Sequence, residues 1–136
     1  TLKTACNKTL TGQTRAVTWN SYGNFVALGG SGQIDISRFD KKTENYVWNM
    51  PSFSLGSADA IDLKWSEDGR YLFVALDNVA DNLRVYHFDG KSLTLISSKT
   101  TGVADQGIVS ISNEQDFIAT AGFSVGTVKC FAVDRA

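Results

Sequence analysis

Few residues of this chain combine a reactive side chain with a spacing that chemistry could use. His87 is the single histidine of the 136 residues, and histidine is the residue that titrates near neutral pH unaided. It stands between Tyr86 and Phe88 in a strand-like stretch, and no Ser or Cys nucleophile is near it in sequence. General acid–base catalysis and nucleophilic catalysis both need a positioned partner, so we interpret His87 as a structural residue.

Two further patterns are explained more simply by turns than by ligands. Asp77, Asn78 and Asp81 could offer oxygen ligands to calcium, but their spacing matches no calcium-loop motif, and a polar turn accounts for it. The glycine cluster of residues 29–32 superficially resembles a phosphate-binding loop. Because no helix signal and no Lys follow it, the cluster predicts a hairpin between two strands. We therefore expect no metal ion and no other cofactor.

The elements that would position these residues belong to an internal repeat. Trp19 and Trp65 are 46 positions apart, and Ile111 follows after 46 more. An aromatic residue follows each of the three at the same offset, at positions 25, 71 and 117. Apolar and polar residues alternate up to each position, which is the period-two pattern of a strand. A constant period through three copies predicts that these residues are buried at equivalent places in three structural units.

Each unit contains signals for four short strands. After the first strand and its turn come a second apolar strand, a cluster of turn residues, a third strand, and a linking segment that predicts an outer strand. Four antiparallel strands in about 45 residues are typical of a β-propeller blade. The sequence therefore predicts an all-β fold with three four-stranded blades, at residues 11–51, 52–98 and 99–136. Residues 1–10 are predicted to form an outer strand.

These units resemble WD repeats. Residues 126–131 stand where that family commonly has Gly-Thr-Val-Arg-Leu-Trp, and residues 81–86 are a similar run in the second unit. The family's Trp-Asp pair is not intact, because Ser, Tyr and Phe occupy the Trp position in the three units, and the structural histidine before the first strand is missing. The turn at residues 68–72 is also similar to that of lactonase-type propellers. The chain is thus identified as a divergent WD-like propeller, with a lactonase-type propeller as the alternative.

The resemblance to WD repeats implies a non-enzymatic scaffold that binds protein partners through the loops of one face. The loops entering the first strands and those between the second and third strands share that face in WD-repeat propellers. By this resemblance the binding residues would be Gln13, Arg15, Asp59, Asn78, Asp81, Asp105, Gln106 and Phe123. Two alternatives stay open. A lactonase or hydrolase propeller would need convergent carboxylates or a metal, and a sugar-binding propeller would need exposed aromatic residues between blades.

Composition narrows the classes of partner. Thirteen basic and fourteen acidic residues give a net charge of −1 without a cluster of Lys and Arg, which disfavours a nucleic-acid partner. No apolar run approaches the roughly 20 residues of a membrane span, so we expect no insertion into a membrane. The sequence does not indicate a compartment.

Three blades cannot close a ring, because propellers have about four to eight. The sequence therefore predicts that the isolated chain is not a stable monomer, and that a second copy or further blades complete the ring. Cys6 lies in the N-terminal segment and Cys130 in the third strand of the last unit. If two copies exchanged these segments, the two cysteines would face each other. A disulfide would then form only with Cα atoms within about 7 Å and in an oxidising compartment.

Overall fold

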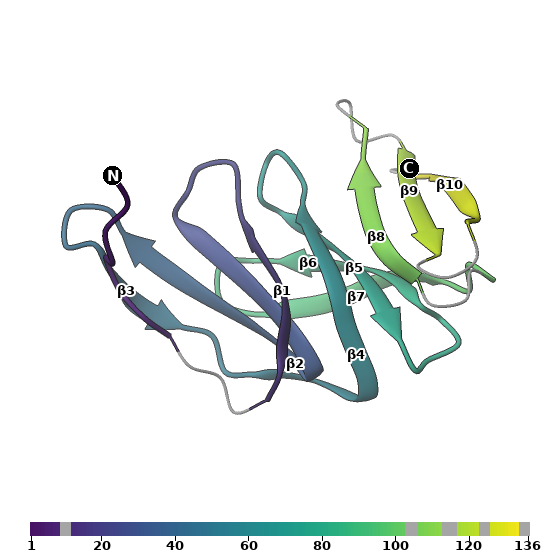
Figure 1. The fold of residues 1–136 in the computed structure, drawn as a ribbon, viewed down its shortest axis with the longest axis horizontal. Coiled ribbons are helices and arrows are strands. Elements are labelled where there is room, and N and C mark those ends of the chain that lie inside the picture. Colours follow the sequence, from purple (N-terminus) through teal and green to yellow (C-terminus); the bar gives the residue numbers. More distant parts are fainter. Residues whose placement is uncertain (9–11, 103–105, 113–116, 123–125, 134–136) are drawn as a thin grey trace.

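The computed structural model describes residues 1–8, 12–102, 106–112, 117–122 and 126–133, and in these ranges it contains strands joined by turns and irregular segments, without a helix (Figure 1). Residues 1–8, which belong to the predicted outer strand, form no regular strand. The strands are β1 (Thr14–Trp19), β2 (Phe25–Asp40), β3 (Asn45–Asn49), β4 (Phe53–Trp65), β5 (Tyr71–Asp77), β6 (Leu83–Phe88), β7 (Leu93–Lys99), β8 (Gln106–Ile111), β9 (Phe117–Gly122) and β10 (Val128–Ala132). All their pairings are antiparallel, as the sequence predicts. No helix in the described ranges is long and apolar enough to cross a membrane.

The strand β2 folds back on itself at the glycine cluster. A straight strand of 16 residues would separate its ends by roughly 50 Å. Instead, the amide of Phe39 donates to the carbonyl of Asn24 at 2.8 Å, so the two ends lie side by side. Gly32 has a φ of 73°, a left-handed conformation that glycine adopts at little cost. The glycine cluster thus forms the hairpin that the sequence predicts.

The outer strand of the first unit continues past its proline. β3 pairs with the second half of β2, and the same ladder extends beyond Pro51 to the pairs Ile34↔Phe53 and Gln33↔Ser54 at the start of β4. We call β1, β2, β3 and this start of β4 the first set. The second set is the rest of β4 with β5, β6 and β7, and the third set is β8, β9 and β10.

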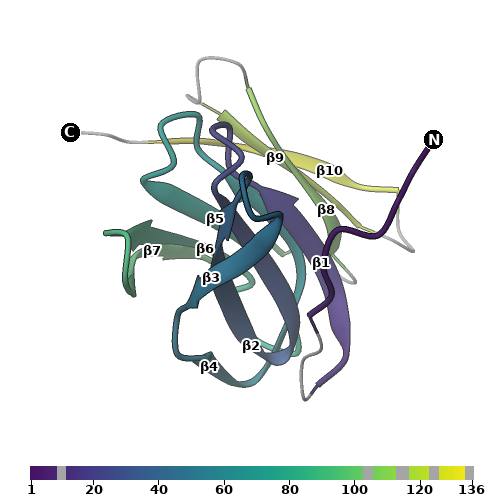
Figure 2. The ribbon, with the colours of Figure 1, turned by 90° about the vertical axis from the view of Figure 1, so that its left-hand side faces the viewer.

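The first strands of the three sets lie next to one another. β1 contacts β4, and β4 contacts β8, although each pair belongs to different sets. The other strands of each set follow outward in chain order (Figures 1 and 2). Sheets that spread from adjacent inner strands have the arrangement of propeller blades around an axis.

The second set is buried on both faces. On β5, Leu72, Val74 and Leu76 point into a core shared with the first set, and Phe73 and Ala75 point into a core shared with the third. This alternation follows from the period-two geometry of a strand. The outer-strand residue Trp48 also packs, partly buried, against the first core.

The prediction that all repeated residues are buried is wrong at the two ends of the array. Trp65, Ile111, Phe25 and Tyr71 are partly buried against the two cores, but Trp19 is 48% exposed. At position 117 the phenylalanine is 55% exposed. The physical reason is that a blade buries such residues against a neighbouring blade, and the described strands supply no neighbour beyond the first and third sets.

Candidate functional site

Each first strand carries a β-bulge near its start. The pairing register shifts between Thr14 and Ala16 in β1, between Ala60 and Asp62 in β4, and between Gln106 and Ile108 in β8. The extra residues are therefore Arg15, Ile61 and Gly107, which are 46 positions apart. Bulges re-aim side chains and are frequent next to active sites. The repeat thus places a distortion at the same end of each innermost strand.

The bulge in β1 directs Arg15 toward the adjacent inner strand. Its Nη2 lies 3.8 Å from Oδ2 of Asp59 on β4. That distance is too long for a hydrogen bond, so the two side chains attract each other only through their opposite charges. The Asp59 side chain is 15% exposed and that of Arg15 is 42% exposed. A cation and a carboxylate from two blades therefore meet at one end of the inner strands.

Asn78 completes this cluster from the loop after β5. Its Nδ2 donates to Oδ2 of Asp59 at 3.0 Å. Asn78 has a φ of 62°, a left-handed conformation that is uncommon outside glycine and that often accompanies functional sites. Gly32, which lies 46 positions earlier, has the same kind of backbone at the tip of its hairpin. We call Arg15, Asp59 and Asn78 the mouth cluster.

Gln13 contributes its backbone to the same end of the first set. Its carbonyl accepts a hydrogen bond from the amide of Ser31 at 3.1 Å. A Cβ atom at Gly30 would stand 1.9 Å from that carbonyl oxygen. Gly30 therefore permits a backbone approach that fixes the start of β1, and with it the bulge at Arg15.

Asp81 belongs to a separate ion pair. Arg84 donates to both carboxylate oxygens of Asp81, at 3.0 and 2.9 Å. The hydrogen bonds from Arg84 hold the pKa of Asp81 below its usual value, and those to Asp81 raise the pKa of Arg84. Arg84 also reaches the hydroxyl of Tyr86 at 3.3 Å. This ion pair ties the loop between β5 and β6, which contains Asp81, to β6 of the same set.

The three remaining binding residues expected from the sequence lie wholly or partly outside the described part of the structure. Asp105 and Phe123 lie outside the described residues. Gln106 is described only by its backbone pairing with Gly122 in β8 and β9. Of the eight, the structure therefore brings together Arg15, Asp59 and Asn78, with the backbone of Gln13 nearby. Sequence reasoning missed the bulges, because Arg, Ile and Gly at positions 15, 61 and 107 share no residue type that could have indicated them.

The other residues considered for chemistry lie elsewhere. His87 packs its ring edge against Tyr71 at 5.6 Å between centroids. Cys6 and Cys130 are both free thiols, Cys6 beside Tyr46 and Cys130 exposed on β10. Their pairing between copies stays a prediction. Within the described ranges, no group of three or more His, Cys, Asp or Glu side chains is placed to hold a metal ion.

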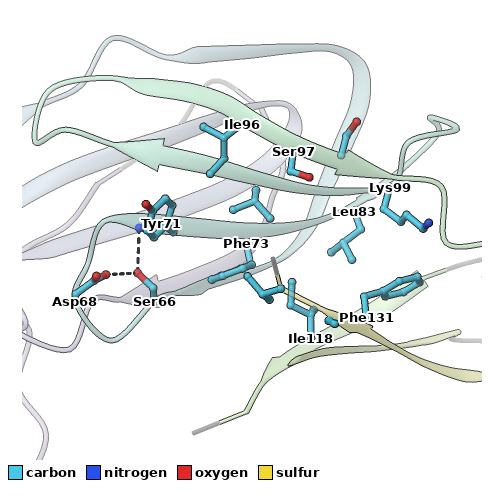
Figure 3. A pocket seen from close by; sticks show the side chains of 14 residues that line it. Ser66, Asp68, Tyr71, Phe73, Leu83, Ile96, Ser97, Lys99, Ile118 and Phe131 are labelled. Atoms are coloured by element: carbon cyan, nitrogen blue, oxygen red, sulfur yellow. Dashed lines mark hydrogen bonds between the residues drawn. The ribbon is translucent and has the colours of Figure 1, made fainter. Parts of the chain in front are cut away.

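A pocket of about 560 Å³ opens between the second and third sets (Figure 3). Its floor is apolar and includes Phe73, Leu83, Ile118 and Phe131, and Lys99 lies at its rim. Asp68 at the other end is tied into a local turn, because Ser66 Oγ donates to its carboxylate at 2.6 Å. The carboxylate of this pocket is thus held in the turn, whereas Lys99 lies at the opposite end of the pocket.

Comparison with known families decides which kind of propeller this is. The model of the family described as "Lactonase, 7-bladed beta-propeller" matches residues 21–136. The chain belongs to this lactonase family. The prediction of a β-propeller is confirmed. The family is the lactonase type, which the sequence offered as the alternative to WD repeats.

Solved structures share the fold of this lactonase-type chain at low sequence identity. A protein from Lactobacillus plantarum aligns with a TM-score of 0.79 and 19% identity, over 90% of this chain and 38% of that one. The periplasmic gluconolactonase of Pseudomonas aeruginosa aligns with a TM-score of 0.77 and 19% identity, over 90% of this chain and 36% of that one. The β-propeller domain of Myceliophteria thermophila Cps50 aligns with a TM-score of 0.63 and 19% identity, over 89% and 38%.

The lactonase-type chain thus spans well under half the length of these structures. A search of curated proteins finds no match. The family match overturns the expectation that the chain is not an enzyme. That expectation relied on the absence of nucleophile, metal and phosphate signatures in the sequence and on the resemblance to WD repeats.

Proposed function

We propose that this chain forms part of a propeller enzyme that hydrolyses lactones. The observation that carries the proposal is the match of residues 21–136 to the lactonase family. The similarity in fold to a periplasmic gluconolactonase supports a sugar-derived lactone as the substrate class. The mouth cluster supports it independently, because it joins a carboxylate to two donors at the end of the inner strands.

Lactone hydrolysis makes three demands on a site. Water must lose a proton as its oxygen bonds to the carbonyl carbon, so a base is needed. The carbonyl oxygen then carries negative charge, which positioned donors stabilise. Finally the ring C–O bond breaks, the ring oxygen takes up a proton, and the product is a hydroxy acid. Side chains with these properties must converge on one substrate position.

The mouth cluster contains groups for the first two demands. In this proposal Asp59 accepts the proton of the attacking water. Asn78 fixes the orientation of that carboxylate through the 3.0 Å hydrogen bond to Oδ2. Arg15 is the more exposed of the ion pair and supplies positive charge to the carbonyl oxygen as it becomes anionic. The bulge in β1 directs this side chain toward Asp59, so the positive charge lies on the same side as the base.

The test is a lactone hydrolysis assay on the native protein. Glucono-δ-lactone is the probe, and acid release above the spontaneous rate is measured at constant pH. Asp59→Asn preserves the shape of the side chain and should lower kcat/KM by about 100-fold or more, the usual contribution of a general base. The matched control is Glu67→Gln, an exposed carboxylate in the turn at the other end of the blade, which should leave kcat/KM unchanged.

The two possible failures differ. If the native protein opens no lactone above background, the proposed function is wrong. If it does and Asp59→Asn retains full activity, the reaction takes place away from the mouth cluster, and the assignment of the site is wrong.

A further inference from the structure

The pocket between the second and third sets has the size and the lining of a small-molecule site. Its volume of about 560 Å³ lies within the range of roughly 300–1,000 Å³ that such sites occupy. Phe73 of the second set and Ile118 of the third belong to its floor (Figure 3). Ile96 on β7 also lines it and is 52% exposed. Apolar side chains of both sets therefore surround a space that a small molecule can fill.

The repeat explains why a pocket is present between these two sets. In the first interface, between the first and second sets, the ring of Phe53 meets that of Tyr86 with centroids 5.2 Å apart. Lys99 is 46 positions after Phe53. Each of the two pairs with the third strand of its own set, Phe53 with Ile34 and Lys99 with Leu83. In the second interface, between the second and third sets, a lysine thus takes the place of the aromatic ring.

The partner ring of that phenylalanine also has an equivalent in the third set. Tyr86 pairs with Leu72, and Phe131 pairs with Ile118, which is 46 positions after Leu72. Phe131 therefore stands in the third set where Tyr86 stands in the second. The residue opposite it is Lys99, whose side chain is exposed. The exchange leaves an apolar floor uncovered and places a cation at its rim.

The two ends of the pocket differ in charge. Lys99 lies at one end, and it forms no ion pair with a carboxylate of the described ranges. Asp68 lies at the other end, where its carboxylate accepts hydrogen bonds from Ser66 Oγ at 2.6 Å and from the amide of Arg70 at 3.0 Å. A negative group is therefore attracted to the Lys99 end and repelled from the Asp68 end. Because the apolar floor extends between these ends, the rest of the ligand must be apolar and elongated.

We propose that this pocket binds a small carboxylic acid with an apolar alkyl chain, of the medium-chain fatty acid class. In this arrangement Lys99 Nζ donates to the carboxylate, and the chain lies against Phe73, Ile118 and Phe131. A single lysine is a point charge that balances one negative charge, which favours a carboxylate over a phosphate. The proposal goes beyond lactone hydrolysis, since no residue of the mouth cluster lines this pocket.

Titration calorimetry of the native protein with octanoate tests the site. Octanoate should bind saturably and about 15-fold more tightly than hexanoate, because each of the two additional buried methylenes is worth about a factor of four. Octylammonium has the same chain with the opposite charge. It should bind at least about fivefold more weakly than octanoate, since it loses an attraction of the strength of an exposed ion pair.

Two substitutions of Lys99 locate the binding. Lys99→Glu should reverse the preference, so that octylammonium binds more tightly than octanoate. Lys99→Phe should abolish the binding of octanoate, because a ring at this place covers the floor as Phe53 covers Tyr86 in the first interface. Lys91→Glu, in the exposed turn before β7, is the matched control and should leave the affinities for both probes unchanged.

Each other outcome overturns the proposal. If octanoate does not bind saturably at millimolar concentration, the pocket is filled or closed in the native protein. Equal affinities for octanoate and octylammonium would mean that Lys99 does not recognise the ligand. Octanoate binding that survives Lys99→Phe, in a variant with the native circular dichroism spectrum, takes place elsewhere. Should Lys99→Phe not fold, the reversal expected for Lys99→Glu decides alone. None of these readouts measures lactone hydrolysis, so a failure here is distinguishable from a failure of the proposed function.

Discussion

Replacing Trp65 by Ala tests the packing of two blades against each other. Trp65 is partly buried, meets Phe88 edge-on at 5.4 Å, and donates to the Thr18 carbonyl at 3.2 Å. Emptying a large aromatic site costs about 3–5 kcal/mol, and partial exposure places this residue at the lower end. About 1 kcal/mol of that comes from the ring pair and about 1 kcal/mol from the hydrogen bond. We therefore expect the free energy of unfolding to fall by about 3 kcal/mol.

The assay is urea denaturation of the native protein, followed by circular dichroism. Trp65→Phe is the matched variant, because it keeps most of the ring and removes the indole N–H. It should lower the free energy of unfolding by about 1–1.5 kcal/mol, mostly through the lost bond to Thr18. An equal m-value for all variants would show that the change lies in stability. A loss below about 1 kcal/mol for Trp65→Ala, which is typical of a surface change, would refute the reasoning.

Three further expectations concern the site end of the blades. Gly30→Ala should lower the free energy of unfolding by at least about 2 kcal/mol, because the added Cβ would lie 1.9 Å from the backbone oxygen of Gln13. Gly12→Ala is the control, since its Cβ would lie 3.5 Å from the nearest atom, and it should change the free energy little in the same urea titration. Asn78→Ala should destabilise by about 1 kcal/mol more than Asn78→Gly in thermal unfolding, since both lose the bond to Asp59 but only Ala strains the left-handed backbone. Asp81→Asn should cost less than about 1 kcal/mol at pH 7, because the pair with Arg84 is partly exposed. The ion pair holds the pKa of Asp81 in the folded protein below that of an unfolded carboxyl group, which is about 4. The stability that the ion pair contributes is therefore present above about pH 4 and is lost as the pH falls through the lower, folded-state pKa. Stability curves of the two proteins should therefore converge in acid, and a constant difference down to pH 2 would contradict the ion pair.

Much of the fold could be predicted from the sequence because the repeat is local and regular. The alternation before Trp19 and Trp65, the turns after them, and the glycine cluster at residues 29–32 each specify a strand or a hairpin without reference to the rest of the chain. Burial could not be predicted in the same way. Trp19 and Trp65 have the same sequence surroundings, and their exposure differs because only Trp65 has a neighbouring set in the described chain.

The candidate site could be predicted only in part, since its geometry comes from backbone distortion. Gln13, Arg15, Asp59 and Asn78 were chosen as loop contacts from the resemblance to WD repeats. That they place a cation and an amide beside the same carboxylate depends on the bulge at Arg15 and on the left-handed backbone at Asn78. Neither feature has a residue signature of its own. For this reason the sequence predicted loop residues without their geometry, and the absence of a catalytic motif led to the wrong expectation that the chain is not an enzyme.

The third copy of the repeat differs from the second at one interface residue of its first strand. The constant period alone would predict the same contacts at both interfaces between sets. The position of Trp65 is taken by Ile111, which has no indole N–H to donate to the preceding blade. Near the second interface, Lys129 Nζ on β10 donates to the carbonyl of Thr101, in the segment that follows β7, at 2.8 Å. The pocket of about 560 Å³ opens in this second interface. The first interface is instead filled by aromatic pairs such as Phe25 and Phe88, whose ring centroids are 5.1 Å apart. Because packed interiors tolerate little empty volume, the more open second interface should be the weaker of the two, and the third set should exchange its amide hydrogens before the second.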